Sequence, residues 1–386
     1  MSGSLFIPGP PAIEAIDRLT DLENLADEFE AARGYQPELI SHWDPKPEFR
    51  RKLEGLVATE SESDESPVDY VYSGYLQLGA LLDRLGERTD RGALLTPSGT
   101  TSIVNAIAYL KNVGCKHLHI ISPSYFAVEA GAGAFGISTS FSEVKRVDRA
   151  YELPPLPHLA EDSAVWLTFP IYGTSCYLNP RSVATFIDSL PNSVVVIVDE
   201  GLAFLDRPSL IHVESLDRVI RISTPSKPIC INGEKFSVVT FPKHLTDSLD
   251  AWSECFSGGI GAAGMRSMRL FQSDHYETVV KSVRTMLSER RSKLSKLLAT
   301  HATVSIDRET DGHFVTSYWP ELSMELADDI SFIKSLIDES GAVPMPSSRN
   351  RHPRHYGFAF RVNLLRLDDA GLGGFARLAD SLDRRV

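Results

Sequence analysis

The chain has 386 residues, of which 42% are hydrophobic and 23% are charged, and its formal net charge is -12. This composition is typical of a globular protein with one large and one smaller domain. An acidic chain without a long basic block argues against nucleic acids and anionic membranes as partners, and no apolar run is long enough to span a bilayer. The four cysteines have neither metal-ligand nor disulfide-framework spacing, and the first residues lack a secretory signal pattern. We therefore expect a cytoplasmic protein that binds small molecules and copies of itself, without a metal site.

The first hundred residues alternate between helical and irregular segments. LTDLENLADEFEAARG predicts a helix that Gly34 closes. In ELISHWDPKPEFRRKL, two prolines near Trp43 and Asp44 predict an extended segment, in which Trp43 is either the wall of a pocket or an anchor for the loop. Residues 60–67, ESESDESP, are acidic and serine-rich, which indicates a solvated loop. A cluster of tyrosines and a short helix follow.

From Gly92 the chain alternates between apolar strands and helices. The strands begin the segments ALLTPSGTTSIVNAIAYLKNVG, HLHIISPSYFAVEAGAGAFG, AVWLTFPIYGTS and VVVIVDEGLAF. Nearly continuous apolar strands separated by helices are typical of a mainly parallel sheet covered on both faces. Ligands bind such sheets where the strands end, so we expect the site there.

The pattern changes after Phe241. A long helical region, SDHYETVVKSVRTMLSERRSKLSKLLATH, precedes the expected strands ATVSI, HFVTSYW and FAFRVNLLR and the expected helices ADDISFIKSLIDESG and FARLADSLDRR. This order predicts a small α+β domain at the end of the chain.

Lys227 is the most informative residue of the sequence. It lies in RISTPSKPICINGEKFSVVT, on an expected turn at the end of a buried strand. A lysine in a partly dry pocket has its charged form disfavoured, so it can act as a nucleophilic amine that forms a Schiff base with an aldehyde. The hydroxyls of Thr224 and Ser226 and the cation of Lys235 suit a phosphate. The ordinary alternative is a surface lysine near the end of a strand.

Three further groups follow strand ends. Ser98, Gly99 and Thr100 begin a helix, where free N–H groups and the helix dipole favour an anion, although a simple N-cap has the same pattern. Asp199 ends VVVIVD, and a carboxylate buried there needs a cationic partner; the alternative is a cap for the next loop. Tyr125 in SPSY offers a flat ring to a ligand or packs in its loop.

Taken together and in this order, from about Leu39 to Phe375, these residues resemble the fold type I pyridoxal-phosphate enzymes, specifically the class I and II aminotransferase family. The resemblance implies an α/β fold, in which a large domain with a mainly parallel, seven-stranded sheet covered by helices accompanies a small α+β domain. The implied boundaries are residues 1–54 for an N-terminal arm and part of the small domain, 55–270 for the large domain, and 271–386 for an interdomain helix and the small domain. It also implies a homodimer with shared active sites and a transaminase acting on an amino acid or amino-acid-like metabolite.

The resemblance also implies roles for single residues. Lys227 would form the Schiff base with pyridoxal 5'-phosphate, Asp199 would pair with the pyridine nitrogen, and Tyr125 would stack on the ring. The phosphate would be bound by Ser98, Gly99, Thr100, Thr224, Ser226 and Lys235, with Lys235 where the family usually has arginine. Tyr70 in DYVYSG resembles the tyrosine that reaches the phosphate of the neighbouring subunit. Arg361 in FRVN matches the arginine that binds the substrate carboxylate, for which a planar guanidinium is suited; its alternative is a strand arginine on a solvated face.

The sequence departs from the family at the ring oxygen of the cofactor. Tyr172-Gly173-Thr174-Ser175 replaces the usual Asn-Pro-Thr-Gly, and Leu202 replaces a tyrosine three residues after Asp199. Tyr172 would donate to that oxygen from its phenol, and Trp43, where the family has a small residue, would reshape the substrate pocket. These changes leave open a lyase, decarboxylase or oxidase of the same fold.

Two readings from other classes are a cofactor-binding module without turnover and a nucleotide-binding sheet protein. The presence of Lys227, Asp199 and Arg361 together argues against the first. The second lacks both a GxGxxG turn and a GxxxxGK[ST] loop between a strand and a helix.

Overall fold

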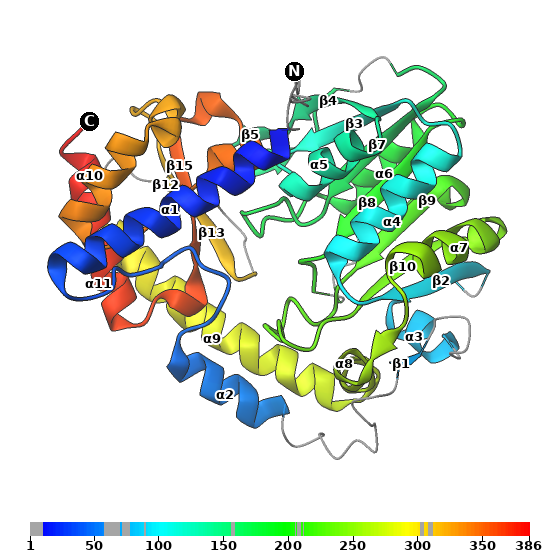
Figure 1. Ribbon diagram of the computed structural model, residues 1–386, viewed down its shortest axis with the longest axis horizontal. Helices are drawn as coiled ribbons and strands as arrows, with labels where there is room; N and C mark the ends of the chain where they lie inside the picture. Colours follow the sequence, from blue (N-terminus) through cyan, green and yellow to red (C-terminus); the bar gives the residue numbers. More distant parts are fainter. Residues whose placement is uncertain are drawn as a thin grey trace, which may run out of the picture.

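The computed structural model describes residues 11–57, 70–71, 78–88, 90–155, 159–204, 206, 210, 212–301, 305–307 and 312–386. Within these ranges the chain forms a large sheet covered by helices and a smaller sheet beside it, joined by one long helix (Figure 1). The loop expected at residues 60–67 lies outside the described residues.

The large sheet has seven strands in the order β2-β10-β9-β8-β7-β3-β4. Their bounds are β2 Arg91–Thr96, β3 His117–Ser122, β4 Ser138–Glu143, β7 Ser163–Thr168, β8 Val195–Glu200, β9 Val219–Ser223 and β10 Ser237–Pro242. All neighbouring pairs from β9 to β4 are parallel, and β10 runs antiparallel to both β9 and β2. The expected mainly parallel, seven-stranded sheet is therefore confirmed.

Helices cover both faces of this sheet because its strands are apolar on both. Along β7, Trp166 packs in one cluster with α4 (Gly99–Asn112), α5 (Phe126–Ala134) and α7 (Thr246–Phe256). Its neighbours Val165 and Leu167 pack in another cluster with α6 (Pro180–Asp188). Alternate side chains of a strand point to opposite faces, so a strand buried on both sides reads as a continuous apolar run.

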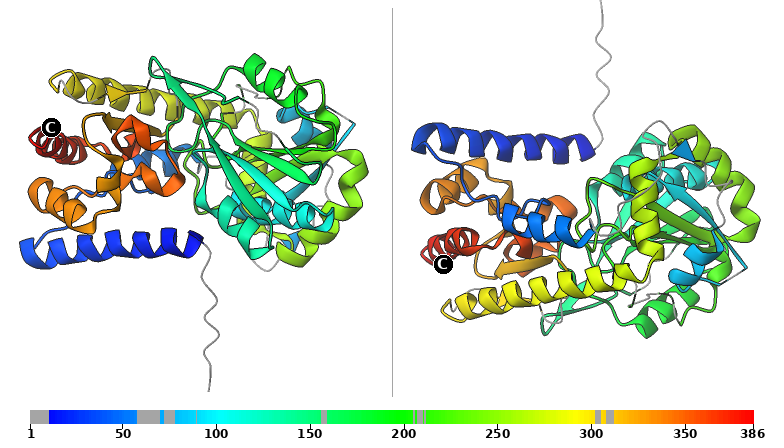
Figure 2. Two further views of the ribbon diagram at one scale, coloured as in Figure 1. Left: turned by 90° about the horizontal axis from the view of Figure 1, so that it is seen from above. Right: turned by 90° about the horizontal axis from the view of Figure 1, so that it is seen from below.

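The smaller sheet is antiparallel, with the order β12-β13-β15-β14. Its strands are β12 Ser305–Ile306, β13 Phe314–Trp319, β14 Met345–Pro346 and β15 Phe358–Asn363, and its helices are α10 Ile330–Ser340 and α11 Asp369–Asp383. The helix α1 (Pro11–Arg33) lies along this half and contacts both α10 and α5 (Figure 2). The expected α+β unit is present, while the exact domain boundaries stay a prediction.

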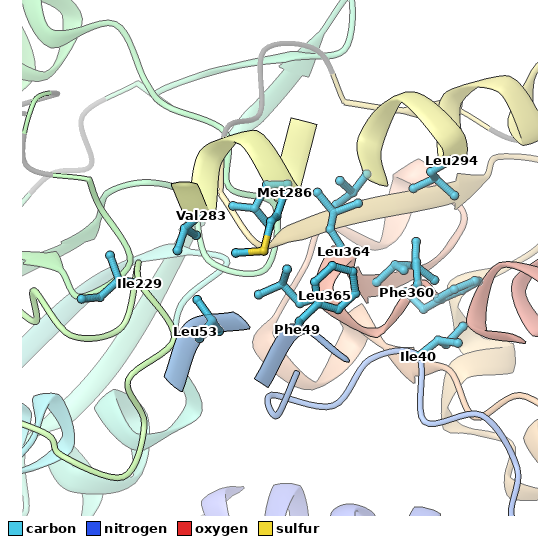
Figure 3. Close-up of a cluster of buried hydrophobic side chains, with 14 of the residues drawn as sticks. Ile40, Phe49, Leu53, Ile229, Val283, Met286, Leu294, Phe360, Leu364 and Leu365 are labelled. Atoms are coloured by element: carbon cyan, nitrogen blue, oxygen red, sulfur yellow. The ribbon is translucent and has the colours of Figure 1, made fainter. Parts of the chain in front are cut away.

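The helix α9 (His275–Leu298) connects the two halves, and α2 (Pro47–Val57) packs beside it. Buried side chains from α2, α9, β15 and the turn after β9 form one cluster, which includes Phe49, Ile229, Val283 and Phe360 (Figure 3). This shared core joins the end of β9 to the smaller sheet.

The remaining elements are short. They are α3 Gly79–Arg84, α8 Ala262–Gln272, a hairpin of β5 Lys145–Val147 with β6 Ala150–Glu152, and β1 Tyr70–Val71 paired with β11 Ile260–Gly261. Turns of 3₁₀ helix lie at Leu216–Arg218, Lys243–Leu245, Met324–Asp328, Ser347–Asn350, Arg354–Tyr356 and Leu364–Arg366. No helix in the described ranges is long and apolar enough to cross a membrane.

Two expectations about element bounds are wrong. The segment around Trp43 is not extended throughout, because α2 begins at Pro47, and a proline suits the first position of a helix. The last helix begins at Asp369, six residues before Phe375, because the side chain of Asp368 accepts the backbone N–H of Gly371 and caps it.

Candidate functional site

Lys227 lies on a hydrogen-bonded turn between β9 and β10. Its backbone N–H donates to Thr224 O at 3.0 Å, and its carbonyl accepts the N–H of Cys230 at 3.0 Å. Burial lowers the pKa of Lys227, and the charges of Lys235 and Arg361 lower it further, while Asp199 opposes the shift. The environment thus disfavours the charged amine, as the sequence predicts for a nucleophilic lysine.

Asp199 lies one residue before the end of β8, the strand next to β9, and only 7% of it is exposed. The N–H of Gly201 donates to Asp199 Oδ1 at 2.9 Å. Burial raises the pKa of Asp199, while this N–H and the amine of Lys227 oppose the shift. A buried carboxylate with one N–H donor can still pair with a protonated ring nitrogen.

The N-terminus of α4 lies directly against the turn that carries Lys227. A Cβ placed on Gly99 would lie 2.8 Å from Thr224 Oγ1 and 3.8 Å from Lys227 Nζ, so only a residue without a side chain fits. Ser98 Oγ accepts the N–H of Thr101 at 3.1 Å, which is the N-cap interpretation of this residue.

The hydroxyls around this helix end differ in their partners. Thr224 Oγ1 donates to Ser237 Oγ at 3.3 Å. Ser226 Oγ is buried and has no hydrogen-bond partner in the described part of the chain. Lys235 is exposed, but its charge reaches Lys227. The free hydroxyl and the helix end form a cradle for an anion.

Aromatic rings lie on two sides of the amine. Lys227 Nζ is 5.9 Å from the ring centre of Tyr125 and 5.5 Å from that of Trp43. Tyr125 in turn lies 5.5 Å from Tyr172, with 33° between the ring planes. Trp43 thus lies beside the amine of Lys227, and its role as the wall of a pocket stays a prediction.

Arg361 lies on β15 and is only 4% exposed, so the interpretation as a solvated strand arginine is wrong. Its Nη1 donates to the phenol oxygen of Tyr172 at 3.3 Å. Its Cζ lies 5.3 Å from the ring centre of Trp43 and 4.8 Å from that of Phe314. Its Nε is buried without a partner, and none of the described carboxylates contacts the guanidinium. A buried cation in this state favours an anionic ligand.

Tyr172 lies on a tight turn with left-handed backbone at Gly173 (φ 79°) and Ser175 (φ 55°). Burial raises the pKa of Tyr172, while Arg361 opposes the shift. Because Arg361 donates to its oxygen, the phenol proton of Tyr172 remains available to an acceptor in the pocket. Leu202, at the other expected ring-oxygen position, has no polar group to offer.

The side chain of Tyr70 lies outside what the structure describes, so its expected role stays a prediction; its backbone pairs with Gly261. Sequence reasoning missed Phe314, His313 and Tyr276. Tyr276 donates its phenol proton to Pro225 O at 2.9 Å, and His313 contacts Pro228 on the other side of Lys227. The available signal was the polar and aromatic start of HFVTSYW, just before an expected strand. No group of three or more His, Cys, Asp or Glu side chains suited to a metal occurs within the described ranges.

No protein-family model matches this sequence, and no curated protein matches it. Solved structures do match over nearly the whole length. A methionine aminotransferase of Escherichia coli is 17% identical, with a TM-score of 0.71 over 94% of this chain and 97% of that one. An aromatic aminotransferase of Pyrococcus horikoshii is 13% identical, with a TM-score of 0.70 over 94% of this chain and 99% of that one.

A third matching structure is a PLP-dependent aminotransferase of Streptococcus suis, 15% identical, with a TM-score of 0.71 over 94% of this chain and 97% of that one. At these low sequence identities, the similarity is evidence for a shared backbone fold. The chain therefore has the fold of these aminotransferases, the fold type I architecture that its sequence predicts.

Proposed function

We propose that the protein is a pyridoxal-phosphate-dependent aminotransferase that acts on an amino acid or amino-acid-like metabolite. One observation carries the proposal: Arg361, a buried guanidinium without a carboxylate partner among the described residues, lies near the same Trp43 ring as Lys227. The charge of Lys227 is disfavoured, and the carboxylate of Asp199 is close enough to act on it. Groups for a substrate carboxylate, an aldehyde and a pyridine nitrogen thus lie together. The fold shared with known aminotransferases supports this interpretation.

The residues present fit the cofactor. Ser226 Oγ is a buried hydroxyl that needs a partner. Gly99 lets the N-terminus of α4 approach the lysine turn closely, because a Cβ there would lie 2.8 Å from Thr224 Oγ1. We assign the phosphate to the N-terminus of α4 at Gly99 and Thr100, with Thr224, Ser226 and Lys235 beside it. Ser98 contributes through the helix cap rather than through a free hydroxyl.

Bound pyridoxal phosphate would supply an aldehyde that condenses with amines and a ring that withdraws electrons from the substrate Cα. Asp199 would hold the proton on the ring nitrogen, and Tyr125 would lie against the ring. Lys227 Nζ, with its lowered pKa, would accept the proton from the substrate Cα. Arg361 would bind the carboxylate, and Trp43 would exclude water from the same pocket.

Tyr172 distinguishes this site from the family pattern. Its phenol oxygen accepts a hydrogen bond from Arg361. If the phenol proton is donated to the ring oxygen of the cofactor, an ionisable donor there would tune the cofactor differently from an amide. A lyase, decarboxylase or oxidase reaction is therefore the second candidate, which the experiment below separates from transamination.

We also propose a cytoplasmic homodimer with shared active sites. The four free cysteines suit a reducing compartment. Tyr70 would reach the phosphate of the neighbouring subunit. A net charge of -12 disfavours nucleic acids as partners.

The test is the visible spectrum of the purified protein during titration with common amino acids. We expect a yellow protein whose band converts to that of the amine form of the cofactor, and borohydride should fix the cofactor on the peptide that contains Lys227. Lys227→Ala should lose the covalent attachment, whereas the control Lys235→Ala should keep it with weaker binding. Labelling of another lysine would disprove the assignment, and gas evolution without conversion of the band would identify the second candidate.

A further inference from the structure

The dipeptide His313–Phe314, at the start of β13, contacts three segments that build the candidate site. His313 Nε2 lies 2.6 Å from Pro228 O, one residue after Lys227. The N–H of Phe314 donates to Ser175 Oγ at 3.1 Å, on the turn that carries Tyr172. The ring of Phe314 lies 4.8 Å from Arg361 Cζ. This junction thus contacts the turn that carries Lys227, the turn that carries Tyr172 and the guanidinium of Arg361.

The imidazole of His313 acts as a donor. A carbonyl oxygen only accepts, so Nε2 carries the hydrogen in the bond to Pro228. His313 is 5% exposed, and burial lowers its pKa to about 4. Near neutral pH the ring is therefore uncharged. The thiol of Cys230 lies beside the ring, with Sγ 3.6 Å from Nδ1.

Two side chains from different parts of the fold hydrogen-bond backbone carbonyls of the turn that carries Lys227. On one side, the phenol of Tyr276, at the start of α9, donates to Pro225 O at 2.9 Å. On the other, His313 donates to Pro228 O from the smaller sheet. The carbonyl of His313 also accepts the N–H of Leu364 at 2.8 Å, three residues after Arg361. His313 therefore joins the lysine turn to the arginine strand, whereas Tyr276 joins it to α9.

The junction has little room to move. A Cβ placed on Gly312 would lie 2.6 Å from the Cβ of Ser175, so the chain passes directly over that turn. Arg291 Nη2 also donates to Gly312 O at 3.2 Å. Close packing of this kind transmits small displacements instead of absorbing them.

We propose that His313 is a positioning residue that sets the separation between the Lys227 amine and Arg361, and so aligns a substrate that carries both an amino group and a carboxylate. This inference rests on the proposed function. In an α-amino acid one carbon atom joins the two groups, so their binding partners must keep a fixed separation. A displacement of about 1 Å in such a site can cost about 100-fold in rate.

The experiment compares His313→Leu, which removes the donor, with His313→Gln, which keeps an N–H at the place of Nε2. Tyr276→Phe is the matched control, because it removes the other hydrogen bond to the turn without touching the link to Arg361. Each holoenzyme is mixed with an amino acid and, separately, with methylamine, an amine without a carboxylate, and the change of the visible band is timed. In cofactor-free protein, the pH profile of Lys227 modification by trinitrobenzenesulfonate is followed by peptide mass mapping.

We expect His313→Leu to slow the reaction with the amino acid by about 10- to 100-fold and the reaction with methylamine by less than about threefold. His313→Gln should recover most of the loss, and Tyr276→Phe should slow both amines by the same factor. In cofactor-free His313→Leu, modification of Lys227 should move to higher pH, because the loosened turn exposes the amine to water. Equal slowing of both amines by His313→Leu, or no recovery with His313→Gln, would overturn the proposal. A wild-type protein that takes up no pyridoxal phosphate would instead disprove the proposed function.

Discussion

At the scale of single residues, Arg361 is the most demanding feature of the site. A buried guanidinium costs several kcal/mol of desolvation, and such charges occur in proteins with an ionic partner or a ligand. Here two aromatic rings and the oxygen of Tyr172 are its neighbours, and its Nε has no partner among the described residues. The residue is thus better explained by a ligand than by the stability of the fold.

Arg361→Lys keeps the positive charge but loses the planar fork that binds a carboxylate at two points. We expect KM for the amino acid to rise by about 100-fold or more, because breaking a buried pair costs about 3–5 kcal/mol. The visible spectrum of the bound cofactor should hardly change. The control is Arg377→Lys, since Arg377 donates to Ser340 O elsewhere in the small domain. Unchanged affinity for carboxylate substrates in Arg361→Lys would make the residue structural.

At the scale of elements, the edge strand β4 is held by a ladder of polar contacts. His117 bonds Ser138 and Ser140 through its two ring nitrogens, and His119 bonds Ser140 and Ser142 in the same way. The distances between the ring nitrogens and the serine oxygens lie between 2.6 and 3.0 Å, and both nitrogens of each ring have a hydrogen-bond partner. A strand of sequence STSFSE has no apolar alternation, so it could not be predicted from pattern.

Burial lowers the pKa of His119, and the nearby His117 lowers it further. In the unfolded chain the pKa of histidine is about 6.5, so as the pH falls His119 is protonated in the unfolded chain before it is protonated in the folded protein. The stability contribution of neutral His119 is therefore complete above about pH 6.5 and is lost below it. We expect the free energy of unfolding in urea to fall less between pH 7.5 and 5 in His119→Gln than in the wild type. The exposed His244→Gln serves as the control, and a parallel pH dependence in His119→Gln and the wild type would contradict the ladder's role.

The sequence predicts the strands that have an apolar pattern and does not predict those, such as β4, that lack one. β7 and β8 each contain a run of four apolar residues, which predicts a buried strand. β10 reverses direction inside a sheet of parallel strands, which no local pattern encodes. α2 is not predicted, because the two prolines near Trp43 favour an extended segment, although the first helical position tolerates a proline.

In the candidate site, residues at strand ends such as Asp199 and Lys227 could be predicted, because parallel strands end at one edge. The contact of Trp43 with both Lys227 and Arg361 joins parts of the chain that are far apart in sequence, and periodicity carries no information about it. The same holds for His313, which reaches the lysine turn from the smaller sheet. Long-range packing, rather than local propensity, places these side chains.

At the scale of the whole molecule, a second polar link joins the two halves. Arg146 and Tyr151, on the hairpin β5–β6, bond the carboxylate of Asp307 at 2.8 Å and 3.1 Å. Tyr318 on β13 also donates to Asp307, at 3.0 Å. The hairpin thus extends from the large sheet to the smaller one and holds a buried acid there.

Burial raises the pKa of Asp307 to about 6, although Arg146 and the two phenols oppose the shift. The folded protein therefore retains a proton that the unfolded chain loses at lower pH, and stability falls as the pH rises from about 4 to about 6. The effect is at most about 3 kcal/mol, since one pKa unit corresponds to about 1.4 kcal/mol. Asp307→Asn should remove this slope from urea unfolding curves, while the exposed Asp338→Asn should keep it. The same slope in Asp307→Asn as in the wild type would assign it to another group.

The last prediction concerns the assembly. The backbone of Tyr70 pairs with β11, and Gly264, at the start of α8, approaches the carbonyl of Lys235. This strand pair therefore lies near the side of the site assigned to phosphate.

If Tyr70 serves the neighbouring subunit, a dimer of one Lys227→Ala chain and one Tyr70→Phe chain contains one intact site. Two weakly active variants mixed in equal amounts, unfolded and refolded together, should then recover about one quarter of the wild-type activity, since half of the dimers are mixed and half of their sites are intact. Each variant refolded alone is the control. If Tyr70 serves its own subunit, mixing recovers nothing, and a fully active monomer in sedimentation would remove the shared site altogether.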